Sequence, residues 1–255
     1  MPVNGDEHRE TAVAALADRD YGAAGEAYSR AAWRCLAEPR DGLSPFAADD
    51  RGWVGSGLAW TATAATAYRV AGRDARAARK AVEGVAVARD LRATTNDNAQ
   101  AACFAEFVAD CKAAGGLDGV ADAYETAADA YREVGAALEE PTEPTTTPLY
   151  QAAADLARHV ARGSANGEIV LEWEDLHGAD PSDGAAFLSA RARVKGRRFP
   201  EFVEAAVADG YLATPRGTTE YGNDNHRCPT CGSSDVNWVA DGTYCLRCST
   251  PMDAD

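Results

Sequence analysis

The C-terminal part of the chain reads Cys228-Pro229-Thr230-Cys231 and, thirteen residues later, Cys245-Leu246-Arg247-Cys248. Two Cys-x-x-Cys pairs at this separation supply four thiolates, the ligand set of a closed tetrahedral zinc site. A redox pair of such motifs is the alternative, but a thioredoxin-type motif needs only one pair beside a βαβ unit. We therefore predict a zinc ribbon at residues 223–255, in which Zn²⁺ is structural because no ligand position is left for water or substrate.

The composition is acidic, with 40 acidic and 25 basic side chains and a net charge of −15 among 255 residues. Such a surface keeps a protein dissolved when salt screens charges, and it is typical of halophilic proteins; an acidic protein from a GC-rich genome shares part of the pattern. The seven cysteines and the lack of an N-terminal signal segment favour a reducing, cytoplasmic location. The uncharged stretch 52–68 is too rich in threonine, glycine and alanine to span a membrane.

Residues 7–137 show a helical pattern, because alanines and aromatic residues recur at spacings of three and four. We expect helices near residues 7–18, 21–37, 50–71, 73–92, 97–114 and 117–137, paired as three hairpins. Residues 25–32 and 121–128 are similar to each other, and both place small residues around a tyrosine, Tyr28 and Tyr124. Small residues at fixed positions allow the close helix packing of stacked repeats.

Residues 20–24, followed by Tyr28 and Ala31, match the small-large pattern of tetratricopeptide-like repeats. Residues 1–137 resemble that family and, in their long alanine-rich hairpins, its attachment-protein (SNAP-like) branch. The family's Trp, Leu-Gly and Pro signature is absent, and the hairpins recur at unequal intervals. The resemblance implies a non-catalytic scaffold that binds protein segments along a concave surface.

Residues 138–148 contain three prolines among polar residues, which predicts a semi-rigid Pro/Thr linker or a long loop inside one helical array. Residues 149–222 predict a helix at 149–162, a strand at 168–173, helices at 181–193 and 198–209, and a hairpin of residues 211–213 and 218–221. This order resembles the winged-helix family. The predicted fold class is mainly α: an antiparallel helical-hairpin array, a small α+β winged-helix-like domain and a β zinc ribbon.

Two groups of basic side chains are candidates for contact with an anionic partner. One forms a stripe at helical spacing and consists of Arg69, Arg73, Arg76 and Lys80. The other lies between the two predicted helices of the winged-helix-like segment and consists of Arg191, Arg193, Lys195, Arg197 and Arg198. Either group could instead pair with nearby carboxylates, as charge runs on helices commonly do.

The sequence shows no pattern of nucleophile, base and open metal site, so we expect no enzymatic activity. We predict a protein-interaction adaptor or scaffold that binds a protein partner through the helical array and has no membrane partner. The alternative is a nucleic-acid-associated transcriptional regulator that acts through residues 191–198. Acidic residues around that segment argue against the broad basic surface expected of a DNA-binding protein.

Overall fold

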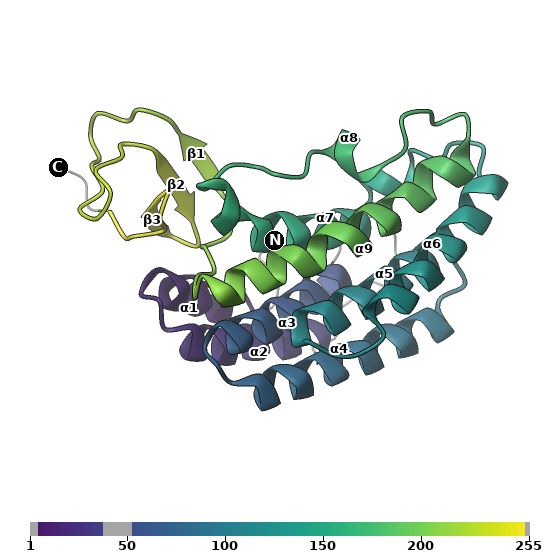
Figure 1. Ribbon diagram of the computed structural model, residues 1–255, viewed down its shortest axis with the longest axis horizontal. Coiled ribbons are helices and arrows are strands. Elements are labelled where there is room, and N and C mark those ends of the chain that lie inside the picture. The colour runs from purple at the N-terminus through teal and green to yellow at the C-terminus, as the bar shows by residue number, and fades with distance from the viewer. Residues whose placement is uncertain (1–4, 38–52, 253–255) are drawn as a thin grey trace.

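The computed structural model describes residues 5–37 and 53–252, and the fold is described for these residues. They form a mainly helical body with a small three-stranded sheet at one end (Figure 1). The first helices are α1 (Asp6–Ala17), α2 (Tyr21–Ala37), α3 (Trp53–Val70), α4 (Asp74–Thr94), α5 (Asn98–Gly115) and α6 (Val120–Ala137). They confirm the six predicted helices, apart from residues 50–52, which lie outside the described residues. Successive helices pack against each other in antiparallel order.

Helices α3 and α5 form the centre of the body. Fourteen of the 18 residues of α3 are buried, as are 13 of the 18 residues of α5. A helix that is apolar on all sides belongs in a core, and this explains the uncharged stretch at residues 52–68. The hydroxyl groups of Thr61, Thr63 and Thr66 donate to the carbonyl four residues earlier, so their burial leaves no polar group without a partner.

Residues 138–148 pack against the helical body. They contain the 3₁₀ helix η1 (Pro144–Thr146), and Thr145 is fully buried. The Thr145 hydroxyl accepts a hydrogen bond from Nε1 of Trp173 at 3.3 Å, and its carbonyl accepts one from Nε2 of Gln151 at 2.7 Å. The segment then enters α7 (Pro148–Ala161), which packs on α3 and α5. A second 3₁₀ helix, η2 (Arg162–Ala165), follows.

The structure contradicts the two predicted helices at 181–193 and 198–209. Residues Gly184–Ala208 form one 25-residue helix, α9, which continues through Pro200 and packs along α6. The basic run suggested a loop between residues 193 and 198, but five residues at a spacing of four form one buried stripe: Phe187, Arg191, Lys195, Phe199 and Val203. A continuous buried face favours a continuous helix over a break at the basic run.

Two further elements of the winged-helix prediction are wrong. Residues 168–172 run without regular secondary structure into the short helix α8 (Trp173–Leu176), and they pair with no strand among the described residues. Residues 211–213 form no hairpin, because strand β1 (Thr218–Glu220) pairs with β2 (Val236–Val239). Residues 149–222 therefore lack the strand and hairpin of a winged helix.

Helices α6 and α9 approach each other at glycines. A Cβ atom built on Gly135 would lie 2.0 Å from the carbonyl oxygen of Gly184, and one built on Gly184 would lie 2.3 Å from the carbonyl oxygen of Gly135. No side chain fits between the two backbones here. This contact sets the distance between α9 and the array.

The sheet has the order β1-β2-β3 and is antiparallel, with β3 spanning Gly242–Cys245. Ala240 and Asp241, with φ of +51° and +56°, join β2 to β3, as a type I′ hairpin turn requires. Val239 and Tyr244 pack against Val13 and Ala17 of α1. The sheet therefore lies against the first helix of the chain (Figure 1). Among the described residues, no helix is long and apolar enough to cross a bilayer.

Candidate metal centre and adjoining groove

The four predicted metal ligands come together beside the sheet. Sγ of Cys228 lies 3.5 Å from Sγ of Cys248, and Sγ of Cys231 lies 3.5 Å from Sγ of Cys245. All four sulfur atoms lie within 4.8 Å of one another. Thiolates about 2.3 Å from a tetrahedral zinc ion are about 3.8 Å apart, whereas a disulfide needs about 2.05 Å. The spacing therefore fits four ligands around one metal ion.

Each Cys-x-x-Cys pair ends in a tight turn. Gly232 has φ +74° and Ser249 has φ +59°, and the N–H of each donates at 2.9 Å to the carbonyl of the first cysteine of its pair. This conformation is unfavourable for serine, but other contacts hold Ser249. Its Oγ accepts hydrogen bonds from the N–H of Thr214 at 2.9 Å and from the hydroxyl of Tyr211 at 3.1 Å. The second turn is thereby attached to the segment that follows α9.

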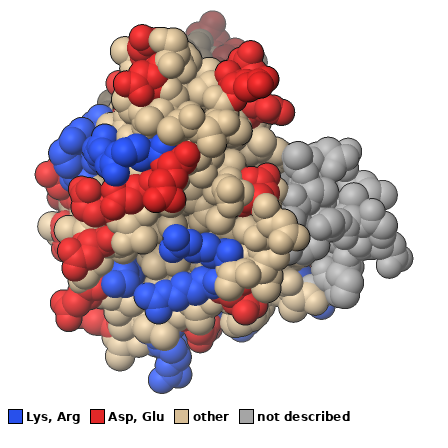
Figure 2. Space-filling model, turned by 90° about the vertical axis from the view of Figure 1, so that its right-hand side faces the viewer, with Lys and Arg blue, Asp and Glu red and all other residues tan. Residues whose placement is uncertain are grey.

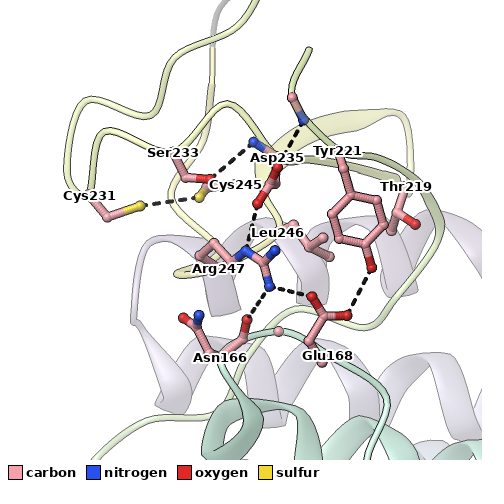
Figure 3. A network of polar contacts seen from close by, with 12 residues as sticks. Asn166, Glu168, Thr219, Tyr221, Cys231, Ser233, Asp235, Cys245, Leu246 and Arg247 are labelled. Carbon is pink, nitrogen blue, oxygen red and sulfur yellow. Dashed lines mark hydrogen bonds and ion pairs between the residues drawn. The ribbon is translucent and has the colours of Figure 1, made fainter.

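Arg247, inside the second Cys-x-x-Cys pair, connects the metal centre to residues 166–168 (Figure 3). Its Nε donates to Asp235 at 2.7 Å, and its Nη1 donates to the carbonyl of Asn166 at 3.1 Å and to the carboxylate of Glu168. The hydroxyl of Tyr221 donates to the same carboxylate at 2.8 Å. These charge-assisted bonds lower the pKa of Glu168, although its partial burial acts in the opposite direction. The network joins β1, the metal ligands and the end of η2.

Arg162 makes the buried part of this attachment. It is 1% exposed, and it donates to the carbonyl oxygens of Gly167 at 3.2 Å, Leu246 at 2.9 Å and Thr214. Burial lowers the pKa of Arg162 to about 10. Among the described residues no carboxylate forms an ion pair with it. Leu246 lies between two of the cysteine ligands, so Arg162 holds the second pair directly.

The cysteines have the chemistry of a thiolate metal site. Burial opposes ionisation of Cys228, but the backbone N–H groups of Cys231 and Thr230 outweigh it and lower the pKa to about 7. Burial raises the pKa of Cys245. A divalent ion with four thiolates carries a net charge of about −2, which the nearby guanidinium groups of Arg162 and Arg247 would balance.

The four cysteines and strands β1–β3 together form what we call the metal module. A cavity of about 630 Å³ lies beside it, and we call this cavity the groove. One side consists of α1, α2, α3 and α7, including Tyr28, Trp60 and His159. The opposite rim consists of residues 168–169, 172 and 215–217. Asn237 of β2 attaches this rim to the sheet, because its Oδ1 accepts from the N–H of Gly217 at 2.8 Å and its Nδ2 donates to the carbonyl of Pro215 at 3.0 Å.

The rim of the groove contains a segment without regular secondary structure or a strand partner among the described residues. Ile169, 41% exposed, and Val170 make no backbone hydrogen bond with any described residue. Leu171 is buried, and its carbonyl accepts a hydrogen bond from Nε of Arg158 at 2.8 Å. The β-branched residues that predicted a strand thus have no regular secondary structure, and their backbone donors and acceptors are unused among the described residues.

The first predicted basic group pairs with carboxylates of neighbouring helices and of α4 itself. Arg69 forms a bidentate ion pair with Glu204 of α9, with hydrogen bonds of 2.9 and 3.1 Å. Arg73 and Arg76 both approach Glu26 of α2, at 3.7 and 2.7 Å. Lys80 contacts Glu83 at 2.5 Å and lies over the ring of Trp33. These contacts match the alternative in which the stripe pairs with nearby acidic residues.

The second predicted basic group is not an exposed loop, because α9 continues through it. Arg191 and Lys195 are buried, 1% and 0% exposed, whereas Arg193 and Arg198 are half-buried and Arg197 is exposed. Arg193 donates to the hydroxyl of Ser189 at 3.1 Å. The five charges therefore point in different directions. On the face shown in Figure 2, basic and acidic side chains lie next to one another and form no continuous basic surface.

Sequence reasoning missed the partners of the two buried cations. Glu106 and Asp110, both fully buried on α5, face them, and we call Glu106, Asp110, Arg191 and Lys195 the buried charge cluster. Nε of Arg191 lies 2.7 Å from Glu106, and Nζ of Lys195 lies 2.5 Å from Glu106 and 2.6 Å from Asp110. The spacing of four in both pairs, within otherwise apolar helix faces, was a usable signal.

No protein-family model matches the chain, and no curated protein or solved structure matches it significantly. Function is therefore inferred from the site itself.

Proposed function

We propose that the protein is a non-catalytic adaptor that binds an extended segment of a partner protein in the groove, and that a structural zinc ion holds the metal module forming one rim. The observation that carries this proposal is the segment at residues 169–170, whose backbone groups have no partner among the described residues, beside a cavity of about 630 Å³. A partner strand added to such an edge gains backbone hydrogen bonds, and side-chain pockets then provide selectivity.

The resemblance of residues 1–137 to tetratricopeptide-like repeats supports the same function, because such arrays bind protein segments. The four-cysteine site supports a zinc ion in a structural role, since four thiolates fill a tetrahedral site. The metal would fix the rim through Arg162, Arg247 and Ser249, whose contacts reach residues 162–168 and 211–216. Zinc would therefore act on binding only through the shape of the groove.

The groove also suits a partner that binds in concentrated salt. Its charged side chains carry both signs, and several pair with each other, such as Arg158 with Asp155 and Arg216 with Glu168. Apolar burial and backbone pairing are less affected by salt than contacts to phosphate, whose affinity falls steeply as salt rises. The nucleic-acid alternative loses its exposed basic loop, because Arg191 and Lys195 are buried in ion pairs.

A pull-down from cell extract at native salt tests the adaptor function. Ile169→Asp places a charge on the rim of the groove, and Val82→Asp is the matched control, because Val82 is 56% exposed on α4, away from the groove residues. We expect Ile169→Asp to lose a protein partner that wild type and Val82→Asp retain. A triple replacement of Arg193, Arg197 and Arg198 by serine should retain it as well. Unchanged partners for Ile169→Asp, or recovery that nuclease abolishes, would contradict the proposal.

A further inference from the structure

The buried charge cluster places a lysine amine against an aspartate carboxyl in the core. Nζ of Lys195 lies 2.6 Å from Oδ2 of Asp110, 2.5 Å from Oε1 of Glu106 and 2.9 Å from the carbonyl oxygen of Ala153. Lys195, Glu106 and Asp110 are each 0% exposed. The hydrogen bond therefore holds the lysine nitrogen beside the carboxyl group of Asp110, which gives the proximity that an intramolecular reaction needs.

The groups around this pair match the needs of amide formation. The hydroxyl of Tyr124 donates at 2.6 Å to Oδ1 of Asp110, where it can stabilise negative charge that develops on that oxygen. Glu106 contacts the same lysine nitrogen and can accept a proton from it. The second oxygen of Glu106 accepts from Arg191 at 2.7 Å and from Tyr131 at 2.5 Å, which fixes the orientation of the carboxylate.

The two carboxyl groups differ in their affinity for a proton. Burial raises the pKa of Asp110 to about 6; the charge of Lys195 acts against this shift, and the charge of Glu106 acts with it. Burial also acts to raise the pKa of Glu106, but the adjacent Arg191 and Lys195 outweigh it and lower the pKa. Environments that separate two carboxyl groups in this way assign an acid and a base. Here they make Asp110 the carboxyl that is protonated more readily, and so the acceptor of a nucleophile, and they leave Glu106 ionised as the base.

We propose that Lys195 and Asp110 condense to form an amide bond between Nζ and Cγ, which cross-links α9 to α5. The lysine ammonium first gives one proton to the Asp110 carboxylate, so that an amine faces a carboxylic acid. The nitrogen lone pair then attacks Cγ, and Glu106 takes a second proton from Nζ and transfers it to the departing Oδ2 hydroxyl. The products are a secondary amide and one water molecule, and Glu106 and Arg191 keep their charges.

The folded protein favours this product in two ways. Condensation replaces two buried charges by a neutral amide, and buried ion pairs carry a large desolvation cost. The remaining charges, Glu106 and Arg191, form a balanced pair at 2.7 Å. Oriented intramolecular reactions also reach effective concentrations of about 10⁵–10⁸ M, which opposes hydrolysis by water. The amide N–H can donate to Glu106, and the amide oxygen can accept from Tyr124, so both polar groups of the new bond have a partner.

The mass of the intact, denatured wild-type protein tests the proposal without any variant. We expect a mass lower by one water than the sequence requires, with the loss located by fragmentation to a joined pair of peptides that contain Asp110 and Lys195. A full mass, with the two peptides recovered separately from freshly purified and from aged protein, would overturn the proposal.

Two variants test whether the lost water comes from the amide between Lys195 and Asp110 or from an unrelated dehydration. Lys195→Arg retains a positive charge but replaces the amine, so its mass should show no loss. Glu106→Gln retains the amine and the acceptor carboxyl but removes the base, and we expect at least a tenfold slower loss of water. Circular dichroism establishes that each variant is folded when it is weighed. An unchanged loss of water in folded Lys195→Arg would also contradict the proposed bond.

Discussion

Replacing Arg162 by methionine should destabilise the protein and loosen its metal centre together. The substitution leaves three buried carbonyl oxygens, those of Gly167, Thr214 and Leu246, without their donor, at about 1–3 kcal/mol each. The substitution also removes a buried charge, whose desolvation cost is seen in the pKa lowered to about 10. Its removal stabilises the folded state by about 3 kcal/mol. The destabilisation from the three unpaired carbonyls is larger than this gain, so we expect the free energy of unfolding to fall by about 3 kcal/mol.

Metal affinity should respond because Leu246 lies between the ligands Cys245 and Cys248. Loss of an outer contact of this kind typically weakens metal binding by about 10- to 100-fold. Chemical denaturation of the metal-loaded protein measures the loss of stability, and competition with a coloured chelator measures the loss of metal affinity. Arg158→Met is the matched control on α7, because Arg158 is 24% exposed and donates to one carbonyl and to Asp155. We expect the control to cost about 1 kcal/mol. Equal stability and metal affinity in the two variants would refute the role given to Arg162.

Three further outcomes are expected. Metal analysis after exhaustive dialysis should find one zinc per chain, and Cys231→Ser should abolish zinc binding. A folded, metal-free ribbon would contradict the predicted zinc site. Burial lowers the pKa of His159 and His177 from 6.5 to about 4. Each histidine therefore contributes stability that is present above pH 6.5, and about 3 kcal/mol of the free energy of unfolding per histidine is lost as pH falls from 6.5 to 4. In denaturation measured over a pH series, His159→Gln should show a shallower dependence on pH. Gly135→Ala should lower the melting temperature, because its Cβ would lie 2.0 Å from Gly184, at about 1–3 kcal/mol; an unchanged melting temperature would contradict the close approach.

The sequence predicted the first six helices well because their signal is local. Alanine and aromatic spacing is repeated within each helix, and short connections force neighbours to pack. The cluster of four cysteines was predictable for the same reason, since Cys228 and Cys231, like Cys245 and Cys248, are close in the sequence and chemically specific.

The prediction failed where the deciding contact is distant in sequence. Arg191 and Lys195 suggested a surface loop because their partners, Glu106 and Asp110, lie on another helix 85 or more residues away. The attachment of the metal module was also invisible, because Arg162 binds backbone carbonyl oxygens, which every residue has. The strand predicted at residues 168–173 was wrong because β-branched residues favour a strand only where a neighbouring strand can pair with them, and none does among the described residues.

Hydrogen exchange of the metal-loaded and the chelator-treated protein tests most directly whether the metal holds the rim of the groove. We predict that metal removal exposes the backbone of residues 162–168, 211–217 and 236–245, while α4 and α5 keep their protection, because their contacts lie within the helical body. Unchanged protection at residues 162–168 and 211–217 after complete metal removal would contradict the account.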